Sequence, residues 1–158
     1  MRPDLPTPRN VRSAGALVTA NFHDGVGIFT GYDLRPGDIR SGTVMIANVG
    51  SVAGSFRLSE AAASNTFAPG ELTLRIDDVT SGDPATVFVG DIGSLPSNGI
   101  DLGCFEPRQS HRFRFLTMLD LNSHSAGRGL GAGAAYEWDF APGEPAAEVS
   151  IATYRAGR

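Results

Sequence analysis

The sequence predicts an all-β fold, a jelly-roll β-sandwich of eight or nine antiparallel strands. Twenty glycines and ten prolines divide the chain at the roughly 8–12-residue spacing that is typical of strands in sandwiches and barrels. The runs between them alternate in polarity or are rich in β-branched and aromatic residues. No window sustains the i, i+3, i+4, i+7 pattern of an amphipathic helix for long.

The first half of the chain contains four predicted strands, residues 14–19, 26–30, 42–48 and 54–59. A turn at residues 34–38 separates the second from the third. It places Pro36 and Gly37 at the two central positions, as a type II turn requires. The strand at 42–48 is strongly apolar, and in 54–59 Phe56 and Leu58 share one face.

The second half begins with the clearest half-buried strand, residues 71–79, where Leu72, Leu74 and Ile76 recur at period 2. The other predicted elements are strands at 86–89, 100–105, 111–119, 134–140 and 149–154, a single helical turn at 94–98, and a glycine-rich loop at 122–133.

A chain of 158 residues fits one domain. Residues 1–12 contain Pro3, Pro6 and Pro8, and proline cannot donate to a strand ladder. We therefore expect a flexible N-terminal arm at 1–12 and a sandwich domain at 13–141. Residues 142–158 form either a tail or an extra strand.

The charge pattern excludes some partner classes. The net charge is −4, and acidic residues are mixed with the arginines except at Arg108, Arg112 and Arg114, so we expect no nucleic-acid partner.

No stretch has the ~18 apolar residues of a membrane span. Residues 1–12 lack the apolar region of a signal peptide. We therefore expect either a mature form with an added start Met or a protein that is not exported by the usual signal.

No catalytic motif is recognisable. The three histidines His23, His111 and His124 form no H-E-x-x-H pair, and the chain has neither a G-x-S-x-G elbow nor a phosphate-binding P-loop. We therefore predict no enzyme, no cofactor and no metal. The single cysteine, Cys104, permits no internal disulfide, and its role is a small buried residue, an intermolecular crosslink or a reactive thiol.

Three groups of residues have a structural and a functional interpretation. Asp77 and Asp78, with Asp83, are either a solvated strand end or a Ca²⁺ site. Arg112 and Arg114 are the wet face of a strand or an anion site. A third group lies at period 2 on one face, where it anchors the core or stacks on sugars: Tyr136, Trp138 and Phe140.

One stretch resembles a known family. It comprises Ser13-Ala14-Gly15-Ala16-Leu17, then Asp33-Leu34-Arg35-Pro36-Gly37-Asp38, then residues 42–51 ending in Asn48-Val49-Gly50-Ser51. With the aromatic segment at 131–140, this resembles the TasA/camelysin (CalY) family of secreted biofilm-matrix and spore-associated proteins. The turn residues that carry the match are Pro36, Gly37, Asp38, Asn48 and Gly50.

The resemblance implies a jelly-roll subunit that polymerises into extracellular fibres, with an N-terminal segment of one copy adding a strand to the next. Leu5, Val11 and Leu17 are then the N-terminal interface candidates. The prolines of residues 1–12 depart from a strand-competent donor, so the C-terminal segment with Val149 and Ile151 is the other candidate. The metallopeptidase activity assigned to some members has no motif here.

From this resemblance we expect a secreted or cell-surface structural subunit that assembles with copies of itself by strand addition. The alternative is a monomeric secreted module that binds a glycan or a protein partner. Which terminus donates the strand stays open.

Overall fold

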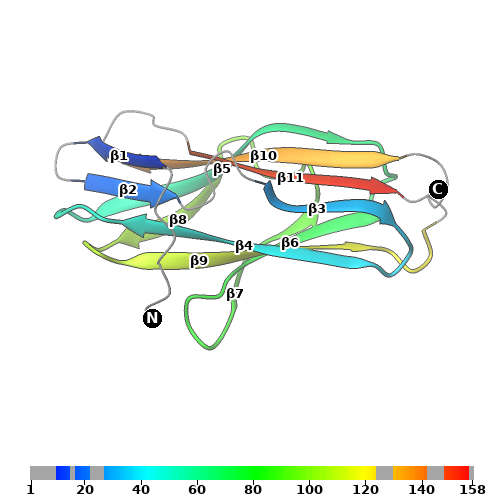
Figure 1. The fold of residues 1–158 in the computed structure, drawn as a ribbon, viewed down its shortest axis with the longest axis horizontal. Coiled ribbons are helices and arrows are strands. Elements are labelled where there is room, and N and C mark those ends of the chain that lie inside the picture. Colours follow the sequence, from blue (N-terminus) through cyan, green and yellow to red (C-terminus); the bar gives the residue numbers. More distant parts are fainter. Residues whose placement is uncertain (1–9, 15–16, 22–26, 124–129, 142–147, 157–158) are drawn as a thin grey trace, which may run out of the picture.

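The computed structural model describes residues 10–14, 17–21, 27–123, 130–141 and 148–156, with side chains for 34–123 and 130–139. Within these ranges the chain forms eleven strands (Figure 1). They are β1 (Asn10–Ala14), β2 (Leu17–Asn21), β3 (Gly27–Leu34), β4 (Ile39–Asn48), β5 (Gly54–Asn65), β6 (Leu72–Asp78), β7 (Ala85–Asp91), β8 (Ile100–Phe105), β9 (Ser110–Leu119), β10 (Gly131–Ala141) and β11 (Glu148–Ala156).

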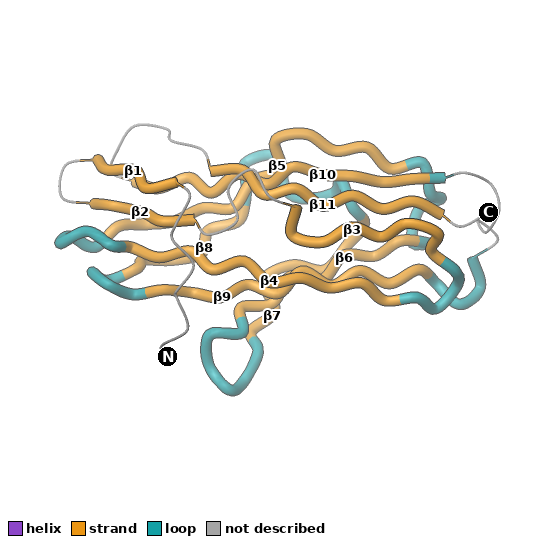
Figure 2. Tube along the Cα trace, viewed as in Figure 1, coloured by secondary structure: helices purple, strands orange, loops and turns teal. Residues whose placement is uncertain are grey.

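The strands form two sheets. One has six strands in the order β1-β2-β4-β9-β6-β7, and the other has five in the order β3-β11-β10-β5-β8. Neighbouring strands are antiparallel except for the parallel pair β11 and β3. Figure 2 shows strands joined by loops, with no helix among the described residues. The all-β sandwich prediction is confirmed.

The finer predictions differ from the structure. Eleven strands occur in the described ranges instead of eight or nine. The strand order does not confirm a jelly roll, since β6 pairs with β7 and β10 with β11 as consecutive hairpins. A period-2 pattern identifies a strand and its buried face, but it contains no information on which strands pair.

Aromatic side chains fill the space between the sheets. Phe113 of β9 lies 5.2 Å from Trp138 of β10, and Phe115 lies 5.0 Å from Tyr136. Such tilted pairs stabilise a core by about 0.5–1.5 kcal/mol each beyond their burial. The apolar side chains of β6 complete this layer, with Leu72, Leu74 and Ile76 at most 1% exposed.

Three predicted elements differ from the structure. The single strand predicted at 14–19 falls on two strands, since Ala14 ends β1 and Leu17 begins β2, and these two pair antiparallel. Residues 94–98 form no helix; the segment makes tight turns, in which Gly99 N–H donates to Pro96 O at 2.9 Å. β5 continues to Asn65, well past the predicted end at residue 59. The run Ala61–Ala63 has little intrinsic strand preference, but ladder pairing with β10 holds it extended.

The terminal segments are described in part. Residues 10–12 of the predicted arm belong to β1, which pairs with β2, and residues 1–9 lie outside the described ranges. The predicted C-terminal segment includes β11. None of the described segments forms a helix with the length and apolar character needed to cross a bilayer.

Candidate interaction surface

β7 is an edge strand of the six-stranded sheet. Its sequence, Ala-Thr-Val-Phe-Val-Gly-Asp, is rich in the β-branched and aromatic residues that favour strands. Among the described strands it pairs only with β6, so the other side of its backbone has no ladder partner. Figure 1 shows the loop between β6 and β7 projecting from the body of the sandwich.

The side chains of β7 are exposed to different extents. Phe88 packs against the core from the inner face, whereas Val89 is 63% exposed. Gly90 leaves room for the Phe88 ring, because a Cβ at Gly90 would lie 2.7 Å from the ring's outer carbon. From Ala85 to Gly90 the strand has no charge and no proline. It therefore lacks the groups with which proteins usually protect an edge from strand addition.

A buried carboxylate fixes β7 to its neighbours. Asp77 of β6 is fully buried, and its carboxylate accepts hydrogen bonds from Arg114 at 2.8 Å, Arg75 at 2.9 Å and the Thr86 hydroxyl at 3.0 Å. Burial alone would raise the pKa of Asp77, but the bonds from Arg114 and Arg75 outweigh it, and the pKa is lowered. The cluster links β9, β6 and β7 across the outer face, so a side-chain hydrogen bond joins β7 to β6 in addition to the strand ladder.

The predicted interface residues lie in strands that are already paired within the chain. Val11 of β1 lies opposite Ala20, and Leu17 of β2 lies opposite Ala14. Val149 and Ile151 of β11 lie opposite Glu137 and Ala135 of β10. Leu5 lies outside the described residues. These pairings leave the outer side of β1 as the other edge of the six-stranded sheet.

The turn of the family motif closes one end of the sandwich. Gly37 has φ of +88°, and Asp38 N–H donates to Arg35 O at 2.9 Å, as the type II turn requires. Gly37 N–H also donates to Leu119 O at 2.7 Å. The turn with Pro36, Gly37 and Asp38 connects β3 to β4, and the Gly37 bond attaches it to the end of β9. These motif residues therefore have a structural role.

Asn48 of the motif is a buried hydrogen-bonding centre. Its Nδ2 donates to Val52 O at 2.8 Å and to Phe105 O at 3.1 Å. Its Oδ1 accepts from Gly50 N–H at 3.0 Å. The side chain is 0% exposed. Asn48 and Gly50 therefore shape the loop that joins β4 to β5.

The other sequence candidates are placed as follows. Tyr136 and Trp138 lie in the core at 0% and 1% exposure, so they are unavailable for stacking on sugars, while the Phe140 side chain lies outside the described part. His111 closes the end of the core, where it stacks on Phe105 at 4.1 Å and its Nδ1 lies 2.6 Å from Asp78 Oδ2.

Asp77 faces arginines and Asp78 faces His111, an arrangement unlike a Ca²⁺ site. Within the described residues no group of three or more His, Cys, Asp or Glu side chains is placed to hold a metal ion. Cys104 is exposed instead of buried. His23 and His124 fall outside the described ranges.

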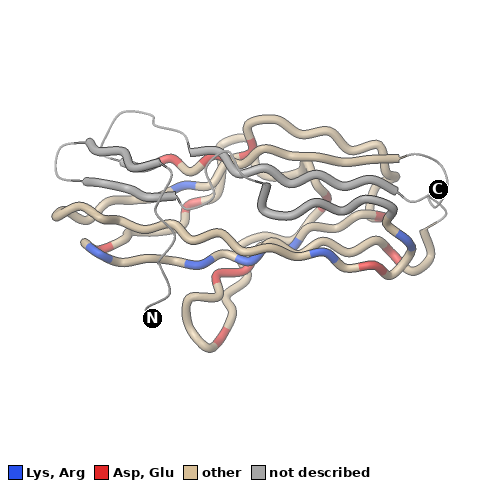
Figure 3. Tube along the Cα trace, viewed as in Figure 1, with Lys and Arg blue, Asp and Glu red and all other residues tan. Residues whose placement is uncertain are grey.

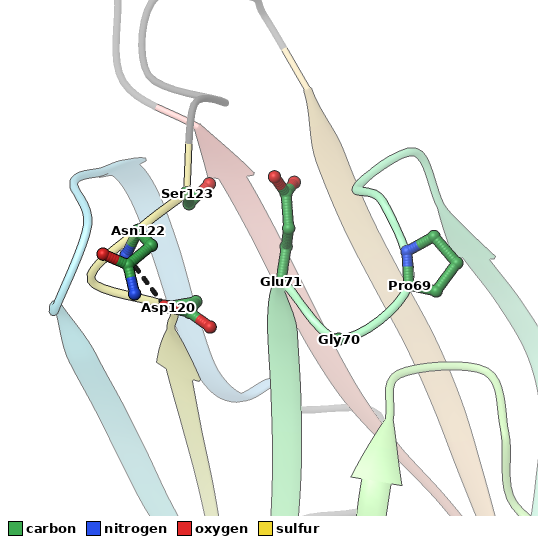
Figure 4. Close-up of a pocket in the computed structure, with 6 residues that line it drawn as sticks. All are labelled: Pro69, Gly70, Glu71, Asp120, Asn122 and Ser123. Carbon is green, nitrogen blue, oxygen red and sulfur yellow. Dashed lines mark hydrogen bonds between the residues drawn. The ribbon is translucent and has the colours of Figure 1, made fainter.

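A shallow polar pocket of about 230 Å³ lies at the end where β6 begins and β9 ends (Figure 4). Asp120 Oδ1 accepts the Asn122 N–H at 2.8 Å, and the Asp120 N–H donates to Glu71 O. The polar groups of the pocket therefore make hydrogen bonds within the turns that form it. It is lined by Pro69, Gly70, Glu71, Asp120, Asn122 and Ser123.

No protein-family model and no curated protein matches the chain. One similar solved structure is a family 123 glycoside hydrolase from Clostridium perfringens, with 8% identity and a TM-score of 0.49 over 83% of this chain and 23% of that chain. A second is PapD-like domain 7 of human CEP192, with 13% identity and a TM-score of 0.46 over 98% of this chain and 94% of that chain. A third is the CooA pilin subunit of enterotoxigenic Escherichia coli, with 7% identity and a TM-score of 0.40 over 82% of this chain and 90% of that chain. The chain thus spans under a quarter of the hydrolase. All three TM-scores are below 0.5, so no family or function follows, and the TasA/camelysin resemblance stays a hypothesis.

Sequence reasoning missed β7 as a surface. It identified residues 86–89 as a short strand, but the edge position depends on the strand order. The available signal lay in the composition of residues 85–90, which contain no Lys, Arg, Glu or Pro and include four consecutive β-branched or aromatic residues at 86–89. Such a segment needs either a partner strand or an inner position.

Proposed function

We propose that the protein is a structural subunit of an extracellular fibre or surface matrix, in which copies join by strand addition at β7. One observation carries the proposal. β7 is an edge strand, uncharged from Ala85 to Gly90, whose only ladder partner in the described structure is β6 and whose Val89 is 63% exposed. The proposal assigns no catalytic role and no cofactor.

Strand addition matches the chemistry of this edge. The outward N–H and C=O groups of β7 would bond to an added strand, and each such bond is worth about 0.5–1.5 kcal/mol net. The added strand would also cover Val89, which now lies beside Arg75 on the outer face. Main-chain bonds give such contacts affinity, and alternate side chains give them specificity.

The N-terminal segment with Leu5 and Val11 is the proposed donor, because Leu17 lies in β2, which already pairs with both β1 and β4. β1 and β7 are the two edges of one sheet, so a donor near β1 that adds to the next copy's β7 would continue the six-stranded sheet from subunit to subunit. The contact uses two different surfaces and does not close, which produces a filament. The resemblance to the TasA/camelysin family implies the same mode, and export to the cell surface is part of this proposal.

The monomeric binding module has less support. Its glycan version relied on the aromatic residues of β10, and Tyr136 and Trp138 are buried. The polar pocket at residues 69–71 and 120–123 is shallow and open. Neither feature favours a bound ligand over self-assembly.

The Val89→Lys variant tests the acceptor edge. A lysine on an edge strand opposes strand addition, so filaments seen in the wild type by negative-stain electron microscopy should disappear. Ser81→Lys makes the same charge change in the exposed β6–β7 loop and should leave them intact. Circular dichroism must show both variants folded.

A truncation of residues 1–12 tests the donor. Loss of filaments in both the truncated chain and Val89→Lys identifies an N-terminal donor. Filaments that survive truncation but disappear in Val89→Lys overturn the N-terminal donor and keep β7 as the acceptor; the segment with Val149 and Ile151 could then donate only by leaving its pairing with β10 and β3. A wild type that stays monomeric at every concentration, or filaments that survive both changes, overturns the proposal.

A further inference from the structure

The outer face of the six-stranded sheet combines arginine with apolar side chains. The ladder register places Met45 opposite Arg112 and Ile39 opposite Met118. Leu116 lies between these pairs on β9 and faces Arg75 of β6. We call this the basic face, formed by Ile39, Met45, Arg75, Arg112, Arg114, Leu116 and Met118.

The composition of the basic face is that of a protein interface. Ile39 is 52% and Met118 is 42% exposed, so two apolar side chains lie side by side in water. Arg112 is exposed and has no ion-pair partner among the described residues. Arginine and methionine are enriched at interfaces, and lysine, which this chain lacks, is depleted there.

The outer face of β10, β5 and β8, the strands of the five-stranded sheet with described side chains, has the opposite charge. Glu137 and Asp139 project from the same face of β10, and Asp101 of β8 lies across β5 from Asp139, with Arg57 between them. In the described part of the chain these carboxylates form no ion pair; Asp139 accepts only the Ser59 hydroxyl, at 3.2 Å. We call this the acidic face, formed by Arg57, Asp101, Glu137 and Asp139.

We propose that the basic face of one copy docks on the acidic face of a second copy. The basic face has three arginines and the buried Asp77, and Asp91 lies at the end of β7 opposite Thr73. The acidic face has three carboxylates and one arginine. Figure 3 shows the arginines that follow β9 along the six-stranded sheet. Either face would repel another face of its own kind. The contact is therefore made between unlike faces and does not close, so copies stack along the normal to the sheets.

This stacking is independent of strand addition. Strand addition lengthens the six-stranded sheet in its own plane through backbone groups of β7, whereas stacking uses side chains on the two outer faces. Charge contacts weaken as the Debye length falls from about 10 Å at 0.1 M salt to about 3 Å at 1 M. Salt should therefore loosen the stacks and leave an existing strand ladder intact.

A charge swap tests the proposal. Arg112→Glu and Glu137→Arg should each weaken association by roughly tenfold or more, because each variant places like charges in contact. In an equal mixture, the variant basic face meets the variant acidic face, and the two remaining faces meet as in the wild type. The mixture should therefore associate like the wild type. Sedimentation velocity at low and high NaCl measures this, with Arg35→Glu, an exposed turn position, as the control.

Cys104 provides a second readout. It is the only cysteine, it is exposed, and its register with Ser55 places it on the acidic face. Its maleimide labelling should slow on association in the wild type and in the mixture, but not in either single variant. Single variants that associate like the wild type, or a mixture that stays dissociated, overturn the proposal.

The Val89→Lys variant separates the two proposals. It leaves the acidic face unchanged and adds a positive charge near the basic one. Salt-sensitive stacks in Val89→Lys without filaments show that stacking operates on its own. Filaments that form with no effect of salt or of the Arg112→Glu change refute stacking and leave strand addition standing.

Discussion

Asn48 is the residue whose chemistry is most tightly defined by its surroundings. An amide side chain offers two N–H donors and one carbonyl acceptor, and the fold uses both kinds: the donors reach Val52 O and Phe105 O, and the acceptor receives Gly50 N–H. An aspartate has the same shape but no donor when ionised. The identity of the side chain is therefore set by the two carbonyl groups that it faces.

Asn48→Asp should be strongly destabilising. It places a carboxylate against two carbonyl oxygens in a site with no exposure, and a buried uncompensated charge costs about 3–5 kcal/mol. Urea unfolding should show a lower midpoint with an unchanged slope. The exposed Asn98→Asp change should alter the midpoint little. Equal stability of the two variants would contradict the role assigned to Asn48.

The turn geometry at residue scale was predictable, and the buried role of Asn48 was not. Pro36 and Gly37 are adjacent in sequence, and the type II turn depends only on local dihedral angles. Asn48, by contrast, donates to Phe105, which lies 57 residues further along the chain. A pattern within a few residues contains no information about a partner at that separation.

At the scale of elements, the segment from Ile92 to Gly99 explains why β7 is the preferred acceptor and β5 is not. β8 pairs with β5 only as far as Leu58. Beyond that point the segment packs beside β5, with Ile92 2% exposed and Gly93 N–H donating to the Glu60 carboxylate at 3.3 Å. A covering loop of this kind protects an edge from added strands.

Gly99→Ala should destabilise this segment. Gly99 has φ of +77°, and a Cβ there would lie 2.8 Å from Leu58 O, a backbone atom that cannot move aside alone. We expect a loss of more than about 1 kcal/mol, measured by thermal unfolding. Gly82→Ala, where a Cβ meets nothing within 4 Å, should be nearly neutral or slightly stabilising. Similar effects of the two changes would refute the steric argument.

Strand positions were predictable where burial alternates along a strand, as in β6, where Leu72, Leu74 and Ile76 are buried. Strand neighbours were not predictable. The position of β7 at an edge and the guarding of β5 by a loop both follow from the pairing of segments far apart in sequence, and alternation alone permits many pairings.

At the scale of the whole molecule, the two proposed contacts use different surfaces and different physics. The β7 edge supplies backbone groups in the plane of one sheet, whereas the outer faces supply side-chain charge along the normal. A protein that used both would form filaments that associate laterally when salt is low. Because strand addition and stacking use different surfaces, a substitution at Val89 tests the first and a substitution at Arg112 tests the second.

Acid should destabilise the fold below about pH 4. Burial is the largest single effect on Asp77 and Asp78 and would raise the pKa of each. Hydrogen bonds from Arg114 and Arg75 to Asp77, and from Thr80 and His111 to Asp78, together outweigh it and lower both pKa values below the usual value near 4. Groups whose pKa is lowered in the folded state stabilise it above that value, and the contribution is lost as the pH falls through the folded pKa. Burial raises the pKa of Glu60. Its charged form is therefore disfavoured in the folded state, and its protonation as the pH falls stabilises the fold, opposite to the effect of Asp77 and Asp78.

The Asp77→Asn variant isolates this pH dependence. An amide cannot carry the charge that balances Arg75 and Arg114, so the variant should be less stable than the wild type at pH 7. Because the wild type loses the Asp77 contribution on protonation, the difference should shrink as the pH falls from 5 towards 2. Urea unfolding across this range measures it, with the exposed Asp83→Asn as the control. A difference that stays constant with pH would mean that Asp77 stabilises the sheet through shape and neutral hydrogen bonds instead of charge.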